Sequence, residues 1–328
     1  MARLIGRKGK LLRVKFWGCN GSIASPCDSE QIESKIKHVL KLAKPDDIAN
    51  EQSIENFLDS LPHGCKGTYK GNTSCVQVIT DSGVNIVFDS GTGIRKMALE
   101  LMASPLGKGQ GELHIFYSHL HWDHIQGFPF FVPAYIPGNK IHIYGVIKEL
   151  EEKFRGQMTH PYFPVPFDGL GADIEFHELQ EGEEVTINQS VKVNSEKLYH
   201  PQVSHAYSVE ESGKKAVYMT DSEFHMTNMQ LIQNAVNLCK DADLFVFDCQ
   251  FTFQDAISKI DWGHSSVFTG IDIATSANAK SLYLFHHEPA YDDFKIEKII
   301  DEAIKYQNAA GNPNLIVQGA YDGLTVDL

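Results

Sequence analysis

The chain has 328 residues, of which 42% are hydrophobic and 22% are charged. A chain of this length and balance can bury a sizeable core, and it predicts one large domain over residues 1–328. The net charge of −13 argues against an extended nucleic-acid-binding surface, because such surfaces depend on Lys and Arg contacts to phosphates. An anionic substrate would instead need a local positive feature, and bound metal ions are one.

The cysteines and the apolar segments bear on the cellular compartment. The six cysteines form no C-x-x-C pair, which favours free thiols in a cytoplasmic protein. Cys27 and Cys65 flank one segment, so a bridge or an extra metal site between them stays open. No segment reaches the ~18 apolar residues of a membrane span, and no membrane contact is expected. Residues 1–10 lack the apolar region of a signal peptide and are expected to lead into the first strand.

The predicted elements begin with a strand over residues 11–17, followed by the turn sequence Gly18-Cys19-Asn20-Gly21-Ser22. Gly and Asn suit a tight turn, and this loop, with Ser22, could offer backbone N–H groups to a phosphate. Residues 27–67 look inserted, because two amphipathic patterns predict helices over 28–43 and 47–61 around a Lys-Pro-Asp-Asp break. This helical insertion could restrict the substrate, make a dimer contact or simply decorate the surface.

A strand pair is predicted over residues 71–78 and 85–89, joined by the turn at 81–83. Asp89 ends the second of these strands. A carboxylate in that place usually satisfies local backbone N–H groups or orients a metal-binding histidine. We expect Asp89 to act indirectly in this way rather than to bind metal itself. An amphipathic helix should follow over residues 94–102.

The most informative stretch follows a buried strand predicted over residues 113–117 and has the spacing H-x-H-x-D-H. His119 and His121 should point the same way, because side chains alternate along an extended chain. Asp123 and His124 can reach the same point once the chain turns. Imidazole and carboxylate groups are the ligands of borderline divalent metals, zinc above all. Four ligands exceed what one ion with an open position needs, so they look like halves of two sites.

Further strands and helices alternate to the end of the chain. The apolar Phe163-Pro164-Val165-Pro166 segment is expected in the core, although Tyr162 or Phe163 could stack on a nucleobase. Ser265 is a plausible cap for a helix running to about residue 277. The remaining predicted strands cover 140–144, 174–179, 184–188, 191–198, 216–220, 243–248, 281–285 and 314–318, and the remaining predicted helices cover 147–158 and 293–307.

More histidines and acids follow these later strands. His200 and His205 come after the strand at 191–198, and Asp221 comes after the next one. A carboxylate has two oxygens, so Asp221 could hold two cations. His264 precedes a helix, and the pair His286 and His287 ends the last core strand, with opposite faces for the two rings.

These motifs together resemble the metallo-β-lactamase superfamily, in particular its phosphodiesterase branch near ribonuclease Z. The residues that carry the resemblance are H-x-H-x-D-H at 119–124, G-N-T-S-C at 71–75, His-Pro at 200–201, Asp221 and Gly-His-Ser at 263–265. The resemblance covers nearly the whole chain. It implies an α+β fold of four layers, αββα, in which two packed sheets carry helices on their outer faces and two metals lie at one edge.

The resemblance also implies a ligand set for two divalent ions. Zinc is expected, with manganese or iron open. The ligand role falls on His286 rather than His287. Substrate contacts are expected from Ser22, Asn72 and Tyr207, and His205 could serve at the mouth of the pocket or be a surface or hydrogen-bonded imidazole. The family's arginine after this tyrosine is Ser208 here, which puts that contact in doubt. The implied sets are His119, His121 and His200 for one ion, Asp123, His124 and His286 for the other, and Asp221 as the bridge.

The implied activity is hydrolysis of a small phosphodiester, most of all a cyclic nucleotide. A hydroxide shared by two ions would attack phosphorus, with Asp123 in the catalytic centre, and His264 would protonate the leaving oxygen. Ribonuclease Z pairs that histidine with a glutamate, whose place is Tyr218 here, so that dyad is not expected. The alternatives are a tRNA-processing endonuclease like ribonuclease Z and a non-catalytic metal-binding protein. Many relatives form dimers, so a homodimer is also expected.

Overall fold

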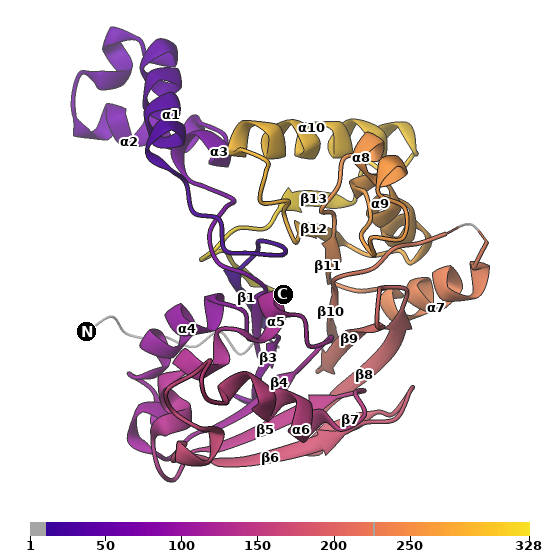
Figure 1. Ribbon diagram of the computed structural model, residues 1–328. Helices are drawn as coiled ribbons and strands as arrows, with labels where there is room; N and C mark the ends of the chain where they lie inside the picture. Colours follow the sequence, from indigo (N-terminus) through magenta and orange to yellow (C-terminus); the bar gives the residue numbers. More distant parts are fainter. Residues whose placement is uncertain (1–10, 226) are drawn as a thin grey trace.

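The computed structural model describes residues 11–225 and 227–328, and the strands within these ranges form two seven-stranded sheets (Figure 1). The first sheet has the order β14 (Thr325–Asp327), β1 (Arg13–Gly18), β2 (Cys75–Ile79), β3 (Asn85–Phe88), β4 (Glu112–Phe116), β5 (Lys140–Gly145) and β6 (Asp173–Glu178). The second has the order β13 (Ile316–Gly319), β12 (Ser281–Phe285), β11 (Leu244–Asp248), β10 (Lys214–Met219), β9 (Ser204–Glu211), β8 (Val191–Leu198) and β7 (Val185–Ile187).

The two sheets pack face to face over one hydrophobic core. Alternate residues of each strand enter it: Phe16 points inward and its neighbour Trp17 points outward. Phe88 of the first sheet stacks on Tyr218 of the second, with 5.1 Å between the ring centroids. The other residues of each strand form separate outer cores with the helices.

Helices cover the outer face of each sheet, which confirms the expected αββα layers. The α-helices are α1 (Ser29–Leu42), α2 (Glu51–Ser60), α3 (His63–Lys66), α4 (Gly93–Leu101), α5 (Trp122–Ile125), α6 (Leu150–Arg155), α7 (Met229–Cys239), α8 (Phe253–Ser258), α9 (Val267–Ser276) and α10 (Asp293–Ala309). The outer core of the first sheet contains α4 and α6, and that of the second contains α7, α9 and α10. Short 3-10 helices are η1 (Pro45–Ile48), η2 (Pro105–Lys108), η3 (Phe128–Phe130), η4 (Val132–Tyr135), η5 (Gly156–Met158) and η6 (Phe167–Gly169).

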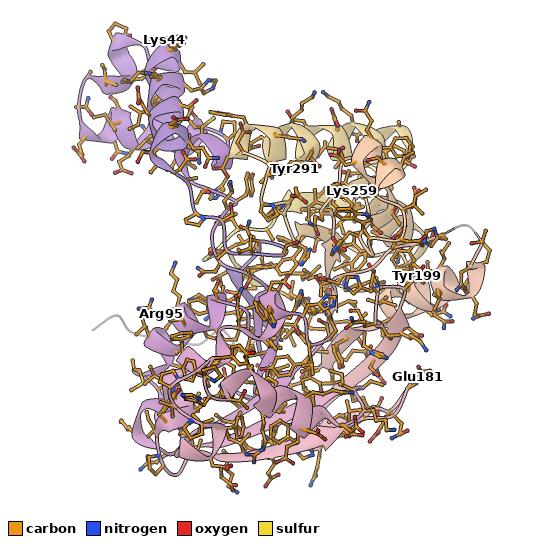
Figure 2. The ribbon with its side chains drawn as sticks, viewed as in Figure 1. Lys44, Arg95, Glu181, Tyr199, Lys259 and Tyr291 are labelled. Carbon is orange, nitrogen blue, oxygen red and sulfur yellow. The ribbon has the colours of Figure 1, made fainter. Side chains whose placement is uncertain are left out.

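The expected helical segment between the first two strands is present as α1, α2 and α3. Asp28 caps α1 by accepting a 2.8 Å hydrogen bond from the backbone N–H of Gln31. Neither α1 nor α2 contributes a fully buried residue. Both helices project from the sandwich near the start of α10, and Lys44 lies at the far end of the projection (Figure 2).

Some predicted elements differ in detail. The helix predicted over 147–158 is shorter, because α6 begins at Leu150 and passes into η5 at Gly156. Ser265 does not cap α9; the helix begins after Ser266, and the Ser265 hydroxyl donates to the Ser222 carbonyl at 2.6 Å. The lead-in predicted for residues 1–10 lies outside the described residues.

All six cysteines lie in the described ranges and are free thiols, and Cys27 Sγ contacts Thr68 and Asp293 instead of Cys65. Across residues 11–225 and 227–328, none of the helices has both the length and the apolar character that a membrane crossing requires.

Parallel pairing determines where the functional residues gather. Strand β3 runs parallel to β4, and β4 to β5; in the other sheet β10, β11 and β12 are parallel. The carboxyl ends of parallel strands meet at one edge of a sheet, and ligands bind there in open α/β sheets. The segments after β3, β4, β10, β11 and β12 therefore lie together at one edge of the sandwich.

Candidate metal centre

The H-x-H-x-D-H segment lies at this edge, directly after β4. His119 and His121 belong to the extended part of the segment, and the chain then turns into the short helix α5. Asp123 and His124 lie in this helix and are buried. Local sequence therefore presents all four side chains to one small volume, as their spacing predicts.

Asp221, at the end of β10, lies between two groups of histidines. Its Oδ2 is 3.6 Å from His119 Nε2 and 3.8 Å from His200 Nε2. Its Oδ1 is 3.2 Å from both His124 Nε2 and His286 Nε2. Each carboxylate oxygen thus faces a different group, as a carboxylate shared by two cations must.

The remaining ligand candidates complete these two groups. His121 Nδ1 lies 3.2 Å from His200 Nε2, on the Oδ2 side. Asp123 Oδ2 lies 3.2 Å from both His124 Nε2 and His286 Nε2, on the Oδ1 side. Two clusters able to hold a metal ion result: His119, His121, His200 and Asp221, and Asp123, His124, His286 and Asp221.

In four histidines the second ring nitrogen donates a hydrogen bond, which fixes the orientation of the ring. The acceptors are Ser118 Oγ for His119 (3.1 Å), Asp89 Oδ2 for His124 (2.7 Å), Gly263 O for His200 (2.9 Å) and Gln250 Oε1 for His286 (3.1 Å). Metal-binding histidines usually have such a partner, which leaves the other nitrogen free for the ion.

The buried nitrogens fit a pair of divalent cations. The Nε2 atoms of His119 and His124 are buried and find no hydrogen-bond partner among the described residues. Burial lowers the pKa of His119 well below its usual value, with the nearby His124 adding to the effect, so this ring stays neutral. Burial raises the pKa of Asp221, but the surrounding histidines outweigh it and hold this pKa well below its usual value. Imidazole nitrogens and carboxylate oxygens together form the donor set that zinc-class ions take.

Asp89 organises the ring of His124 from behind. Its Oδ2 accepts from His124 Nδ1 at 2.7 Å and from the Tyr218 hydroxyl at 2.8 Å. Its carboxylate also accepts from the backbone and the hydroxyl of Ser118. The structure therefore gives Asp89 the indirect, orienting position expected for it.

Three residues of the centre have a left-handed backbone. The φ angles are 57° at Asp89, 47° at Asp221 and 60° at His286. Asp89 and His286 directly follow the last residues of β3 and β12, and Asp221 is the second residue after the end of β10. Non-glycine residues adopt this conformation rarely, and it concentrates at functional sites. The turn at His286 leaves His287 on the other side, where its Nε2 lies 2.8 Å from the Ala320 carbonyl oxygen.

His264 has an acidic partner that the sequence did not indicate. Its Nδ1 lies 2.9 Å from Oδ2 of Asp248, the last residue of β11. Burial lowers the pKa of His264, but Asp248 outweighs burial and raises the pKa to about 9. Tyr218 stands in the place of the ribonuclease Z glutamate and donates to Asp89, and the acid that pairs with His264 comes from β11 instead.

The centre opens into a cavity of about 530 Å³. Trp122 stands at this opening with 80% of its surface exposed, and sequence reasoning did not select it. An aromatic residue inside the metal-ligand motif was a signal that could have identified it. The lining consists of Ser22, Leu120, His121, Trp122, Asp123, Asp221, His264 and His286.

Three expected substrate contacts lie elsewhere. Tyr207 is completely buried and donates to the Tyr117 carbonyl at 2.8 Å, so the expectation of a substrate contact was wrong. His205 is also buried, and burial lowers its pKa to about 4. The side-chain amide of Asn72 donates to Asp322 at 2.9 Å. Of the predicted contacts, Ser22 alone belongs to the described cavity lining, and its backbone N–H donates to Asp123 at 2.8 Å.

Curated proteins share sequence similarity with part of this chain. The chain is 29% identical over 163 residues to a ribonuclease Z from Cyanothece sp., which covers 49% of this chain and 44% of that relative. The chain thus spans less than half the length of the first curated relatives it matches.

Solved structures share the fold. The metallo-beta-lactamase fold protein YhfI from Bacillus subtilis superposes with a TM-score of 0.63 at 17% identity, covering 98% of this chain and 100% of YhfI. A diphosphatase from the PhnP family superposes with a TM-score of 0.59 at 18% identity, covering 97% of this chain and 98% of the diphosphatase.

The sequence model of the family described as the beta-lactamase superfamily domain matches residues 84–287, which is more than half of the chain. The matched range contains every residue of the two histidine–aspartate clusters. The chain therefore belongs to the family of beta-lactamase superfamily domains.

Proposed function

We propose that this protein is a metal-dependent phosphodiesterase whose substrate is a small phosphodiester, specifically a cyclic nucleotide. The observation that carries the proposal is the division of Asp221, whose two oxygens face two separate histidine groups beside His264. Such a paired site suits in-line displacement at phosphorus, where both the attacking and the leaving oxygen need stabilisation.

The proposed ions are zinc, because five imidazoles and two carboxylates form the donor set. Bound there, two such ions supply Lewis-acid stabilisation of the phosphate oxygens and lower the pKa of a bound water. The protein's own part is orientation. Asp89, Ser118, Gly263 and Gln250 fix four of the rings before substrate arrives.

His264 is the proposed proton donor to the leaving oxygen. It lines the cavity, and Asp248 holds its Nδ1. The other nitrogen, Nε2, is then the one available to a substrate. Since Asp248 keeps the pKa of His264 raised, the ring carries its proton at neutral pH, as a general acid must.

The opening supports a small substrate. A cavity of about 530 Å³ lies within the range of small-molecule sites. Trp122 at its rim offers an aromatic face on which a base can stack. The net charge of −13 disfavours a long polyanion such as tRNA.

The second candidate is a tRNA-processing endonuclease, and the similarity to ribonuclease Z favours it. The name of the PhnP-family neighbour, a diphosphatase, is compatible with phosphate-ester chemistry on small molecules. The two candidates share a metal centre and differ in substrate size.

The test is a substrate panel for the zinc-loaded protein: bis(p-nitrophenyl) phosphate, 3′,5′- and 2′,3′-cyclic nucleotides and a precursor tRNA. We expect cleavage of a cyclic nucleotide, and a loss of about 1,000-fold or more in Asp221→Asn because the shared carboxylate is gone. Asp81→Asn, in an exposed turn, is the matched control and should keep full activity. Cleavage of the tRNA alone would favour the second candidate, and no turnover of any ester would refute both.

A homodimer is the proposed assembly, through the inserted helices. Ile32, Ile36 and Leu40 follow one face of α1 and are 49%, 55% and 67% exposed. Contiguous exposed apolar side chains are typical of an interaction surface. Light scattering should show a dimer for the unmodified chain and a monomer for Ile36→Asp, and a monomer in both would refute this assembly.

A further inference from the structure

A second group of histidines and carboxylates lies on the first sheet, away from the centre described above. It comprises Glu112 and His114 on β4, His142 on β5, and Glu175 and His177 on β6. His114 precedes His119 by five residues of nearly extended chain, which separates the two places by about 15 Å. The group therefore shares no ligand with the candidate metal centre.

Strand register explains why these side chains meet. His114 pairs with His142 across β4 and β5, and His142 pairs with Glu175 across β5 and β6. The strands are parallel and alternate residues share a face, so His177 points the same way as Glu175. Their outward neighbours Ile174 and Phe176 pack under the helices instead. The group consequently lies on the inner face of the sheet, close to its β6 edge.

Three donor atoms of this group converge. His142 Nδ1 is 3.2 Å from His177 Nε2 and 3.3 Å from Glu175 Oε2, and the last two atoms are 3.8 Å apart. A triangle with these sides has a circumradius of about 2.0 Å, so one ion can lie about 2.0–2.1 Å from all three donors, the distance that zinc takes from nitrogen and oxygen ligands.

The opposite nitrogen of His142 has the partner that a metal-binding histidine needs. Its Nε2 lies 3.0 Å from Glu112 Oε1. A carboxylate on one ring nitrogen places the proton there and leaves the other nitrogen free for a cation. Asp89 stands in this relation to His124 in the candidate metal centre.

The neighbouring residues that the structure describes pack against the histidine rings and bring no lysine or arginine to the two glutamates. The Tyr144 ring stacks on His177 with 4.4 Å between centroids. Among the residues that the structure describes, neither Glu112 nor Glu175 forms an ion pair with a lysine or arginine.

We propose that His142, Glu175 and His177 bind a third divalent ion of the zinc class, with Glu112 as the residue that orients His142. Two imidazoles and a carboxylate form a three-ligand set that leaves a position for water. The ion would join β5 to β6, the edge strand of the sheet. This site is independent of the proposed phosphodiesterase activity.

The test is zinc content measured on the full chain after equilibration with Zn²⁺ and removal of free metal. We expect three zinc ions per chain in the unmodified protein and two in both His177→Ala and Glu175→Gln. Glu175 is 53% exposed in its side chain and its replacement is isosteric, so the fold should survive. Glu178→Gln, on the same strand but on the outer face, is the matched control and should retain three.

Anomalous scattering at the zinc edge locates the ion. A peak between His142, Glu175 and His177, absent in His177→Ala, would establish the site, and phosphodiester hydrolysis should be the same in both proteins. Two zinc ions per chain in the unmodified protein, or three retained in both variants, would overturn the proposal. Neither result depends on whether the protein cleaves phosphodiesters.

Discussion

His264 Nδ1 lies 2.9 Å from Asp248 Oδ2, and the carboxylate is fully buried at the end of β11. The imidazole therefore has one nitrogen fixed inside the protein and one directed to the cavity. Asp248 also accepts from the backbone N–H of Ser222 at 3.0 Å, directly after the shared carboxylate of Asp221. One acid thus positions the proposed proton donor and the loop that carries the bridge.

Replacing Asp248 by Asn should move the alkaline limb of the pH–kcat profile to lower pH. The general acid acts while protonated, so activity is lost as pH rises through its pKa, and removing the carboxylate removes the cause that raises this pKa. For a diester with a poor leaving group, we expect kcat at pH 8 to fall about 10- to 100-fold. Bis(p-nitrophenyl) phosphate, whose leaving group hardly needs a proton, serves as the internal control. An unchanged pH profile would contradict the assignment.

Tyr218→Phe should be more destabilising than Tyr207→Phe. Both side chains are buried in the core between the sheets, but Tyr218 donates to the Asp89 carboxylate whereas Tyr207 donates to a backbone carbonyl. Hydrogen bonds to charged groups contribute about 1.5–3 kcal/mol and neutral ones about 1 kcal/mol. Urea unfolding of the two variants measures the difference. Equal losses of unfolding free energy would show that the hydrogen bond from Tyr218 to Asp89 contributes no more than a neutral one.

Gly263→Ala should disturb the metal centre far more than Gly213→Ala. Both glycines have φ near 80°, at 85° and 80°, so each replacement introduces similar backbone strain. A Cβ at Gly263 would also lie 2.2 Å from His200 Nδ1, whereas nothing lies within 4 Å of one at Gly213. We expect Gly213→Ala to cost about 1–2 kcal/mol of unfolding free energy with full zinc content. Gly263→Ala should cost more and lose zinc, and retention of both ions would contradict the role of His200.

Trp122→Ala should weaken the use of substrates that carry a base. The indole is exposed at the cavity rim, and stacking on a base contributes about 1–3 kcal/mol. We expect kcat/KM for a cyclic nucleotide to fall about 10-fold or more, with zinc content unchanged. Tyr162→Ala is the control, because Tyr162 is equally exposed but lies outside the cavity lining. Equal effects of both variants would remove Trp122 from the substrate site.

The sequence predicted what local geometry determines. The spacing from His119 to His124 places four donors in one loop whatever the rest of the fold does, and the structure brings these side chains together. Apolar patterns likewise predicted most strands, whereas the layered fold was implied by the family resemblance. The choice of His286 over His287 came from resemblance, and its physical basis is the positive φ that turns one ring inward.

Contacts between residues far apart in the chain could not be predicted from the sequence. Nothing in the apolar strand that ends at Asp248 indicates that its acid faces His264, because the pairing depends on how β11 meets the start of α9. Tyr207 could not be placed either: its position was carried over from a family pattern, and the register of β9 directs it into the core. The cluster around His142 escaped notice because its members lie on three separate strands.

The left-handed backbone at Asp89, Asp221 and His286 sets a limit on how robust this chain can become. Glycine would adopt those angles without cost, while strained conformations of other residues cost about 1–3 kcal/mol each. Laboratory selection for heat resistance alone would therefore favour glycine at these three positions, although the proposed chemistry requires their side chains. A selection that monitors catalysis as well should leave these three residues in place and gather its stabilising substitutions elsewhere.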